Sequence, residues 1–122
     1  MSNEHIYRAL APWKMYERPD GTVSNAAFKD DKGASVELQC DRSDDEVVIH
    51  MHEYLKGNIA KVGCSICEKT GIEIVNEPSS NTYHRILLNK YRIDDSDRCL
   101  TDEQADDLAE NIASILKYNP SV

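Results

Sequence analysis

The sequence has no long apolar run and none of the short motifs that identify common active sites. No stretch approaches the roughly 18 apolar residues of a membrane span, and the polar start MSNEHIYR lacks the apolar centre of a signal peptide. A nucleophile elbow, a glycine-rich phosphate loop, an HExxH pair and a second CxxC are all absent. We therefore expect a cytoplasmic protein with no membrane contact and no cofactor.

Basic residues are few relative to acidic ones. The chain has 14 Lys and Arg against 22 Asp and Glu, which gives a formal charge of −8. This excess repels phosphate backbones, and no local basic patch offsets it. The balance predicts that the protein does not bind nucleic acid. An acidic surface serves solubility, or contact with a basic protein partner.

Length and composition fit one small globular domain. The chain has 122 residues, of which 40% are apolar and 30% charged, enough for a single core but not for two. No repeat, linker or low-complexity run divides it, so we expect one domain over residues 1–122. The order of elements predicts an α+β fold, with a small mixed or antiparallel sheet and two or three helices.

Alternating and β-branched segments predict the strands. In the stretch 35–40, Val36 and Leu38 alternate with Glu37, which predicts a strand at a sheet edge or with one exposed face. The stretch around Ser24 fits either a returning strand or a short helix that Ser24 caps. The other expected strands are 4–10, 58–62, 72–75 and 82–88.

Two capping boxes predict helix starts, one at Ser43 with Glu46 and one at Thr101 with Gln104. The first helix is expected to stop before Gly57. The second is expected to be a long C-terminal amphipathic helix of about 17 residues, because apolar residues recur at helical spacing. These apolar residues are Ala105, Leu108, Ile112, Ile115 and Leu116.

The Cys64-Ser-Ile-Cys67 motif has three interpretations: buried structural thiols, half of a zinc site, or a redox pair at a helix start. His50 and His52 point in nearly opposite directions on a helix, so they cannot chelate one ion together. We predict a metal-free protein in which Cys64 and Cys67 are reduced thiols at the start of a short helix. Zinc would need further ligands from Cys40, Cys99, His50, His52 or His84.

Four polar residues support an enzymatic hypothesis. Arg8, Ser24, Lys29 and His84 lie on or beside expected strands and could line one pocket for a nucleotide-like or phosphorylated ligand. An arginine can clamp an anion, and a histidine can act as a general base. No spacing links the four residues. The alternative is a salt-bridged arginine and a strand histidine with one satisfied hydrogen bond.

The segment around Trp13, Met15 and Tyr16 supports a different hypothesis. These large side chains follow a proline and show no clear period, and Trp and Tyr are enriched at contact hot spots. They either cover the core or form a contact surface. Since no catalytic constellation is visible, our leading interpretation is a non-enzymatic component of a multi-protein system, with a protein partner and an unknown oligomeric state.

Four segments carry a resemblance: IYRAL, GTVSNAAFK, SVEL and SNTYHRILL. Together they resemble a small group of uncharacterised bacterial proteins of about this length, to which no activity is attached. The Tyr-Arg start also resembles the first strand of NAD-consuming toxins of the ADP-ribosyltransferase type, where such an arginine contacts the dinucleotide; the rest of that pattern is missing. The residues that match the bacterial group are Tyr7, Arg8, Ser24, Ala27, Phe28, Lys29, Ser35, Val36, Asn81 and His84.

Overall fold

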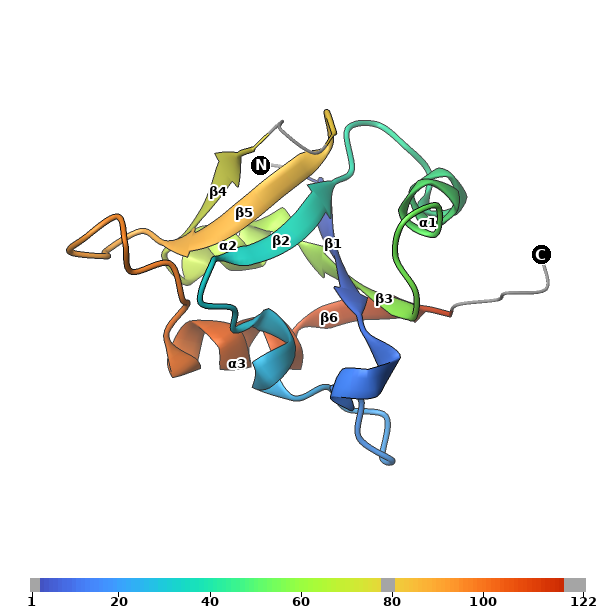
Figure 1. Cartoon of the computed structure of the whole chain (residues 1–122), viewed down its shortest axis with the longest axis horizontal. Helices are drawn as coiled ribbons and strands as arrows, with labels where there is room; N and C mark the ends of the chain where they lie inside the picture. Colours follow the sequence, from blue (N-terminus) through green and yellow to red (C-terminus); the bar gives the residue numbers. More distant parts are fainter. Residues whose placement is uncertain (1–2, 78–80, 118–122) are drawn as a thin grey trace.

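A computed structural model of the chain describes residues 3–77 and 81–117. It contains a six-stranded antiparallel sheet with the strand order β4-β5-β2-β1-β3-β6 (Figure 1). Together with its helices, the sheet confirms the α+β class. Within these two ranges, no helix has the length and apolar character needed to cross a membrane.

The strands are β1 (His5–Leu10), β2 (Ala34–Leu38), β3 (Asn58–Gly63), β4 (Ile72–Asn76), β5 (His84–Asn89) and β6 (Ile112–Leu116). The helices are α1 (Asp44–Met51), α2 (Cys64–Lys69) and α3 (Asp102–Glu110). Two short 3-10 helices, η1 (Pro12–Lys14) and η2 (Asn25–Phe28), lie between β1 and β2 in the chain.

One face of the sheet packs against η2, α2 and α3 and holds the larger core. Phe28 of η2 and Leu108 of α3 are fully buried there, with Ile6 and Val62 from the central strands. Cys64 and Cys67 of α2 complete this core. We call this side the apolar face.

The opposite face is covered in part by α1, and we call it the α1 face. Val47 and Met51 of α1 pack on Tyr7 and Ile59, which are buried on strands β1 and β3. The Tyr7 hydroxyl donates to Asp44 Oδ1 at 2.8 Å, so a polar contact fixes the helix start over the sheet.

The C-terminal helix is shorter than predicted. It ends at Glu110, and residues 112–116 form the edge strand β6, which pairs with β3. Between Lys61 and Val62 the register shifts, so Ile112 and Ile115 both pack on the apolar face although they lie three residues apart. A β-bulge of this kind imitates helical spacing, which explains the wrong prediction.

Other local predictions are confirmed or corrected. Both capping boxes are present, and Ser24 caps η2, so the short-helix alternative is the right one. Helix α1 ends at Met51, well before Gly57. Strand β2 lies inside the sheet between β5 and β1, so the prediction of an edge strand is wrong. On the face predicted to be exposed, Ser35 is exposed, but Glu37 is only 1% exposed.

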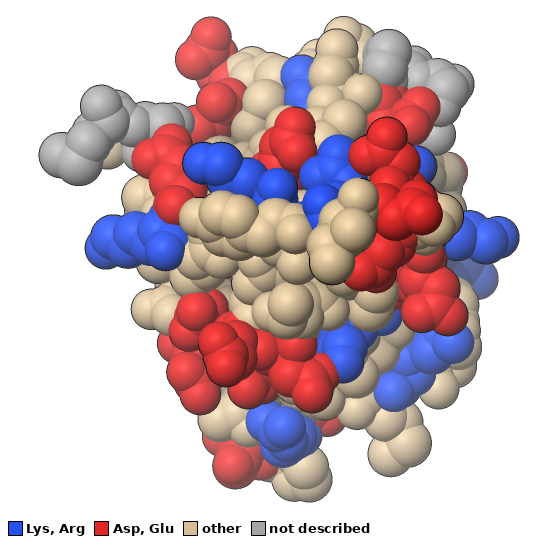
Figure 2. All heavy atoms as spheres, turned by 90° about the vertical axis from the view of Figure 1, so that its left-hand side faces the viewer, with Lys and Arg blue, Asp and Glu red and all other residues tan. Residues whose placement is uncertain are grey.

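Surface charge is mixed on the face formed by the left-hand side of Figure 1. Figure 2 shows acidic and basic side chains interspersed there, with no continuous basic patch. This agrees with the net acidic composition and contrasts with the pocket described next.

Candidate functional site

The two central strands β1 and β2 separate after two paired positions. Ile6 pairs with Leu38 and Tyr7 with Glu37, and the pairing stops there, whereas β1 continues to pair with β3 as far as Leu10. Residues 8–10 of β1 and 34–36 of β2 therefore border an opening within the sheet. We call it the β1–β2 gap.

Arg8 bridges this gap at Ser35, two residues from the paired Glu37. Its Nε donates to the Ala27 carbonyl and its Nη1 to the Ser35 carbonyl, each at 2.8 Å. No carboxylate pairs with Arg8 within residues 3–77 and 81–117, and Nη2 has no acceptor there. Burial lowers the pKa of Arg8, but a guanidinium remains charged at physiological pH. The geometry leaves a positive donor for a further anion.

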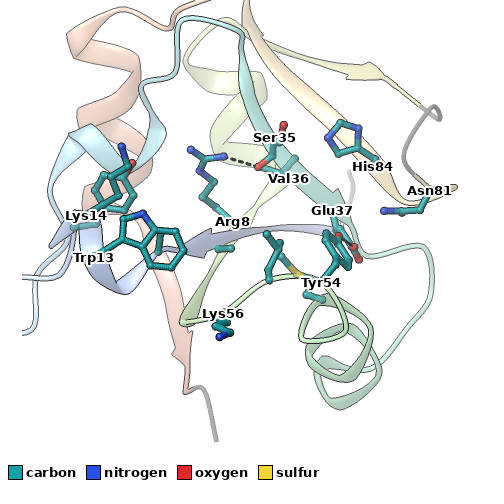
Figure 3. A pocket seen from close by; sticks show the side chains of 15 residues that line it. Arg8, Trp13, Lys14, Ser35, Val36, Glu37, Tyr54, Lys56, Asn81 and His84 are labelled. Atoms are coloured by element: carbon teal, nitrogen blue, oxygen red, sulfur yellow. Dashed lines mark hydrogen bonds between the residues drawn. The ribbon is translucent and has the colours of Figure 1, made fainter. Parts of the chain in front are cut away.

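A pocket of about 690 Å³ opens at the gap (Figure 3). It is lined from both sides of the sheet: Met51 and Leu55 lie on the α1 side, and Tyr16 and Val36 pack with the apolar core. Pockets of roughly 300–1,000 Å³ hold small ligands. Apolar atoms make up most of its wall. The lining residues are Arg8, Ala9, Ala11, Trp13, Lys14, Tyr16, Ser35, Val36, Glu37, Met51, Tyr54, Leu55, Lys56, Asn81 and His84.

The charges of the pocket are mainly positive. Arg8, Lys14 and Lys56 line it, and Glu37 is the one acidic residue of the lining. Glu37 is already engaged, because Arg42 Nη1 donates to its Oε1 at 3.0 Å. In a chain with a net charge of −8, this is a local cationic site.

Glu37 is the buried centre of a polar cluster at the far end of the pocket. His50 Nδ1 lies 2.9 Å from Glu37 Oε2, and the Tyr54 hydroxyl donates to the same oxygen. Burial, and next the hydrogen bond to Glu37, raises the pKa of Tyr54. The cluster therefore keeps Tyr54 protonated as a donor and holds the carboxylate in place.

Arg42 and Tyr83 connect the Glu37 cluster to residues outside the pocket. The Arg42 guanidinium carbon lies 3.5 Å from the centre of the Tyr83 ring, and Arg42 Nη2 donates to the Leu38 carbonyl at 2.7 Å. The His50 ring contacts the Tyr83 ring edge to face, with centroids 5.3 Å apart. Sequence reasoning missed Glu37, Arg42 and Tyr83 because no spacing in the chain joins them.

His84 and Asn81 stand at the same end of the pocket as Glu37 (Figure 3). His84 Nδ1 lies 2.8 Å from the Glu77 carbonyl. A carbonyl only accepts, so Nδ1 carries the proton, and Nε2 of the neutral ring can accept a hydrogen bond. The Asn81 side chain accepts from the Tyr83 N–H at 2.8 Å.

The four residues of the enzymatic hypothesis do not all meet. Arg8 and His84 both line the pocket. Their side chains start from different faces of the sheet, because Arg8 alternates with Tyr7 of the α1 face, whereas His84 pairs with Glu37 on that face. This placement counts against a joint catalytic role. Ser24 instead caps η2 through the Ala26 N–H, and Lys29 forms an ion pair with Asp102 near α3. Neither lines the pocket, so the structure separates Ser24 and Lys29 from the candidate site.

The predicted contact residues lie at the rim of the pocket. Trp13 is 72% exposed and Met15 83% exposed, whereas Tyr16 packs against the apolar core. Trp13 and Tyr16 also line the pocket. Met15 ends η1 in a left-handed conformation, with φ 55°, which is uncommon for a residue other than glycine. The exposed rim is compatible with contact to a partner.

The two thiols of the Cys64-Cys67 motif are buried and free. Burial raises the pKa of Cys64 to about 11 and that of Cys67 to about 12, which opposes the thiolate that redox chemistry needs. Gly63, not Cys64, occupies the N-cap of α2. Throughout residues 3–77 and 81–117, no three His, Cys, Asp or Glu side chains are grouped as metal ligands. The metal content stays a prediction.

No protein-family model, no curated protein and no solved structure matches the chain. The candidate site must therefore be interpreted from its own geometry. That geometry combines a cation that bridges a gap in the sheet, an apolar wall, and a fixed hydrogen-bonding group at the far end.

Proposed function

We propose that the pocket binds a small anionic group attached to an apolar body. The observation that carries this proposal is Arg8, a half-buried guanidinium that forms no ion pair with a carboxylate in the described ranges of the chain and feels Asp30 only at longer range. A charge removed from water normally requires a partner of opposite sign. An anionic ligand would supply that partner.

The remainder of the pocket supports the same ligand chemistry. Lys14 and Lys56 add two exposed cations beside Arg8, which attract an anion at long range. Met51, Leu55 and Trp13 offer an apolar wall. The pocket thus suits ligands that combine an acid group with a hydrophobic part, such as aryl or alkyl carboxylates and phosphates.

The single tryptophan of the chain provides the assay, because Trp13 lies at the pocket. Benzoate and phenyl phosphate are titrated while Trp13 fluorescence is followed, with benzyl alcohol as the uncharged control. We expect saturable quenching by the two anions, weaker binding at higher salt, and no saturation with the alcohol. Equal binding of benzyl alcohol would contradict the proposal.

Charge-reversal variants test whether anion binding depends on the cations at the pocket. Lys14→Glu with Lys56→Glu should weaken anion binding several-fold, because two attractive charges near the pocket become repulsive. Lys32→Glu with Lys90→Glu makes the same change in net charge at exposed positions outside the pocket and serves as the control. If both pairs weaken binding equally, the effect belongs to net charge and not to the pocket.

Contact with a protein partner is the second candidate function, and the exposure of Trp13 and Met15 favours it. Co-purification from the native cell with mass spectrometry should recover a partner that Trp13→Ala with Met15→Ala loses. Tyr91→Ala with Ile93→Ala removes two other exposed apolar side chains and is the matched control. A partner retained by the first pair would exclude this surface.

A further inference from the structure

We propose that the β1–β2 gap binds the C-terminal end of an extended peptide chain, with its carboxylate on Arg8. This inference rests on the proposed function and names the ligand of that site as the free C-terminus of a partner protein. The gap, the cation that bridges it and the exposed apolar rim each contribute an argument.

The backbone of the gap presents hydrogen-bonding groups to an added chain. The Gln39 N–H donates to the His5 carbonyl at 3.0 Å, so the N–H and C=O groups of His5, Tyr7 and Ala9 point towards β2. Continued in register, the next hydrogen-bonded pair would join Ala9 and Ser35, but the pairing stops at Tyr7.

Ala9 and Ser35 therefore keep free backbone groups within a sheet. Both residues line the pocket, and the Ser35 carbonyl is taken by Arg8. In the described part of the chain, the Ala9 N–H and C=O and the Ser35 N–H have no partner. Backbone groups of a sheet are normally paired, and an extended peptide pairs them by strand addition.

The shape of the gap selects a chain end. At Tyr7 and Glu37 the two strands are hydrogen-bonded to each other, so a chain that enters the gap cannot pass beyond this point. The Arg8 guanidinium crosses the gap to the Ser35 carbonyl, so a chain that enters from the open end meets this charge before the closure. The positive charge suits a carboxylate and repels an ammonium. The chain end is therefore the C-terminus and not the N-terminus.

The open end of the gap fits apolar residues that precede the carboxylate. Ala9, Ala11 and Trp13 line one side of the pocket, and Met51 and Leu55 line another. Lys14 and Lys56 surround this apolar wall with positive charge, which favours a partner of acidic character near its C-terminus.

The test measures binding of N-acetylated tetrapeptides, built from alanine, valine and leucine residues, to the whole protein. Binding is detected as a change in Trp13 fluorescence. Each peptide is prepared with a free C-terminal carboxylate and as the C-terminal amide. We expect the free acids to bind at least about tenfold tighter than the amides, since a charge-assisted hydrogen bond contributes most to such a site. A ratio near one would overturn the inference.

Peptide methylation and one substitution test the strand-like pairing. N-methylation of the backbone amides should weaken binding about three- to tenfold, the loss expected for one or two hydrogen bonds. Ala9→Pro removes the N–H that faces the gap but no hydrogen bond to β3, and should reduce peptide affinity to the same degree.

The outcomes separate the two proposals. If benzoate binds but free-acid peptides bind no tighter than benzoate, or if N-methylation has no effect, the peptide inference is wrong and the anion site stands. If neither benzoate nor any peptide binds, both proposals are wrong. A peptide amide that ends in aspartate carries a carboxylate on its side chain only. If it binds with the same affinity as the free-acid peptide, recognition of the chain end is also excluded.

Discussion

The two faces of the sheet are built from different chemistry. The apolar face buries Phe28, Leu108 and Cys67 with little polar content. The α1 face buries Glu37 and Arg42 and leaves a pocket beside them. A buried charge pair rarely increases stability over an apolar substitute, because desolvation offsets the attraction. The contrast indicates that the apolar face stabilises the fold, and the α1 face shapes a site.

The largest expected effects compare the two faces directly. Phe28→Ala should lower the free energy of unfolding by about 3–5 kcal/mol through a cavity. Glu37→Leu should cost a similar amount, about 3–5 kcal/mol, because Arg42 is left as a buried cation without its carboxylate. Urea denaturation monitored by circular dichroism measures both.

A double variant distinguishes the causes. Glu37→Leu with Arg42→Leu removes both charges and should recover part of the stability lost in Glu37→Leu, because no unpaired charge remains. No second substitution at a neighbour should recover the loss in Phe28→Ala, where only volume is missing. A double variant that is less stable than Glu37→Leu alone would contradict this view of the α1 face.

The thiols of the apolar face predict alkaline sensitivity. An unfolded thiol loses its proton near pH 8.5, whereas burial holds the pKa of Cys64 at about 11 and of Cys67 at about 12. Between these pH values the folded state binds more protons, so stability falls as pH rises, by about 1.4 kcal/mol per pH unit for each thiol. Below pH 8 the thiols add no pH dependence.

Cys64→Ala with Cys67→Ala is the matched variant for this slope. It should be less stable at pH 7 but lose less stability than the parent between pH 8.5 and about 10.5. Thiol labelling of the folded protein at pH 8 should modify the half-exposed Cys40 and Cys99 before the buried pair. Identical pH slopes in the parent and the variant would contradict burial of the thiols.

Glycine substitutions test the loop that carries the pocket cation Lys56. Gly57 has φ +100°, and a side chain there would clash with the Leu10 carbonyl and contact Pro12. Gly21 has a similar φ of +88° but open space around it. Gly57→Ala should therefore destabilise the protein more than Gly21→Ala, which pays about 1 kcal/mol for backbone strain alone. Thermal unfolding of both variants gives the comparison.

The smallest expected effect is at Lys29, on the apolar side of the molecule. Lys29 pairs with the exposed Asp102 and lies outside the pocket. Lys29→Gln should leave the Trp13-detected affinity for benzoate unchanged and alter stability only slightly, as for most surface ion pairs. A clear loss of benzoate binding would return Lys29 to the site from which the structure separates it.

Local signals in the sequence determined several elements. The capping boxes at Ser43 and Thr101 satisfy the free N–H groups of a helix start within four residues, so they formed as predicted. The strands at 4–10, 58–62 and 72–75 followed from short apolar patterns that need little information from elsewhere in the chain.

Tertiary pairing decided the elements that were predicted wrongly. Residues 112–116 carry helical spacing, but their backbone groups pair with β3, and a bulge turns Ile112 and Ile115 to the same face. Glu37 alternates like an exposed residue, yet β2 lies inside the sheet and Arg42 and His50 surround its carboxylate. Neither the pairing of residues 112–116 with β3 nor the burial of Glu37 can be predicted from the local periodicity of the sequence.

The candidate site was only partly visible in the sequence. Arg8 and His84 were named as polar strand residues from residue type and local context alone, and Trp13 as either a cover of the core or a contact residue. The gap that unites them depends on where β1 stops pairing with β2, residues that lie about thirty positions apart in the chain. The sequence determined the side chains, and the long-range register of the sheet decided that they share one pocket, because hydrogen bonding between distant strands fixes which backbone groups stay free.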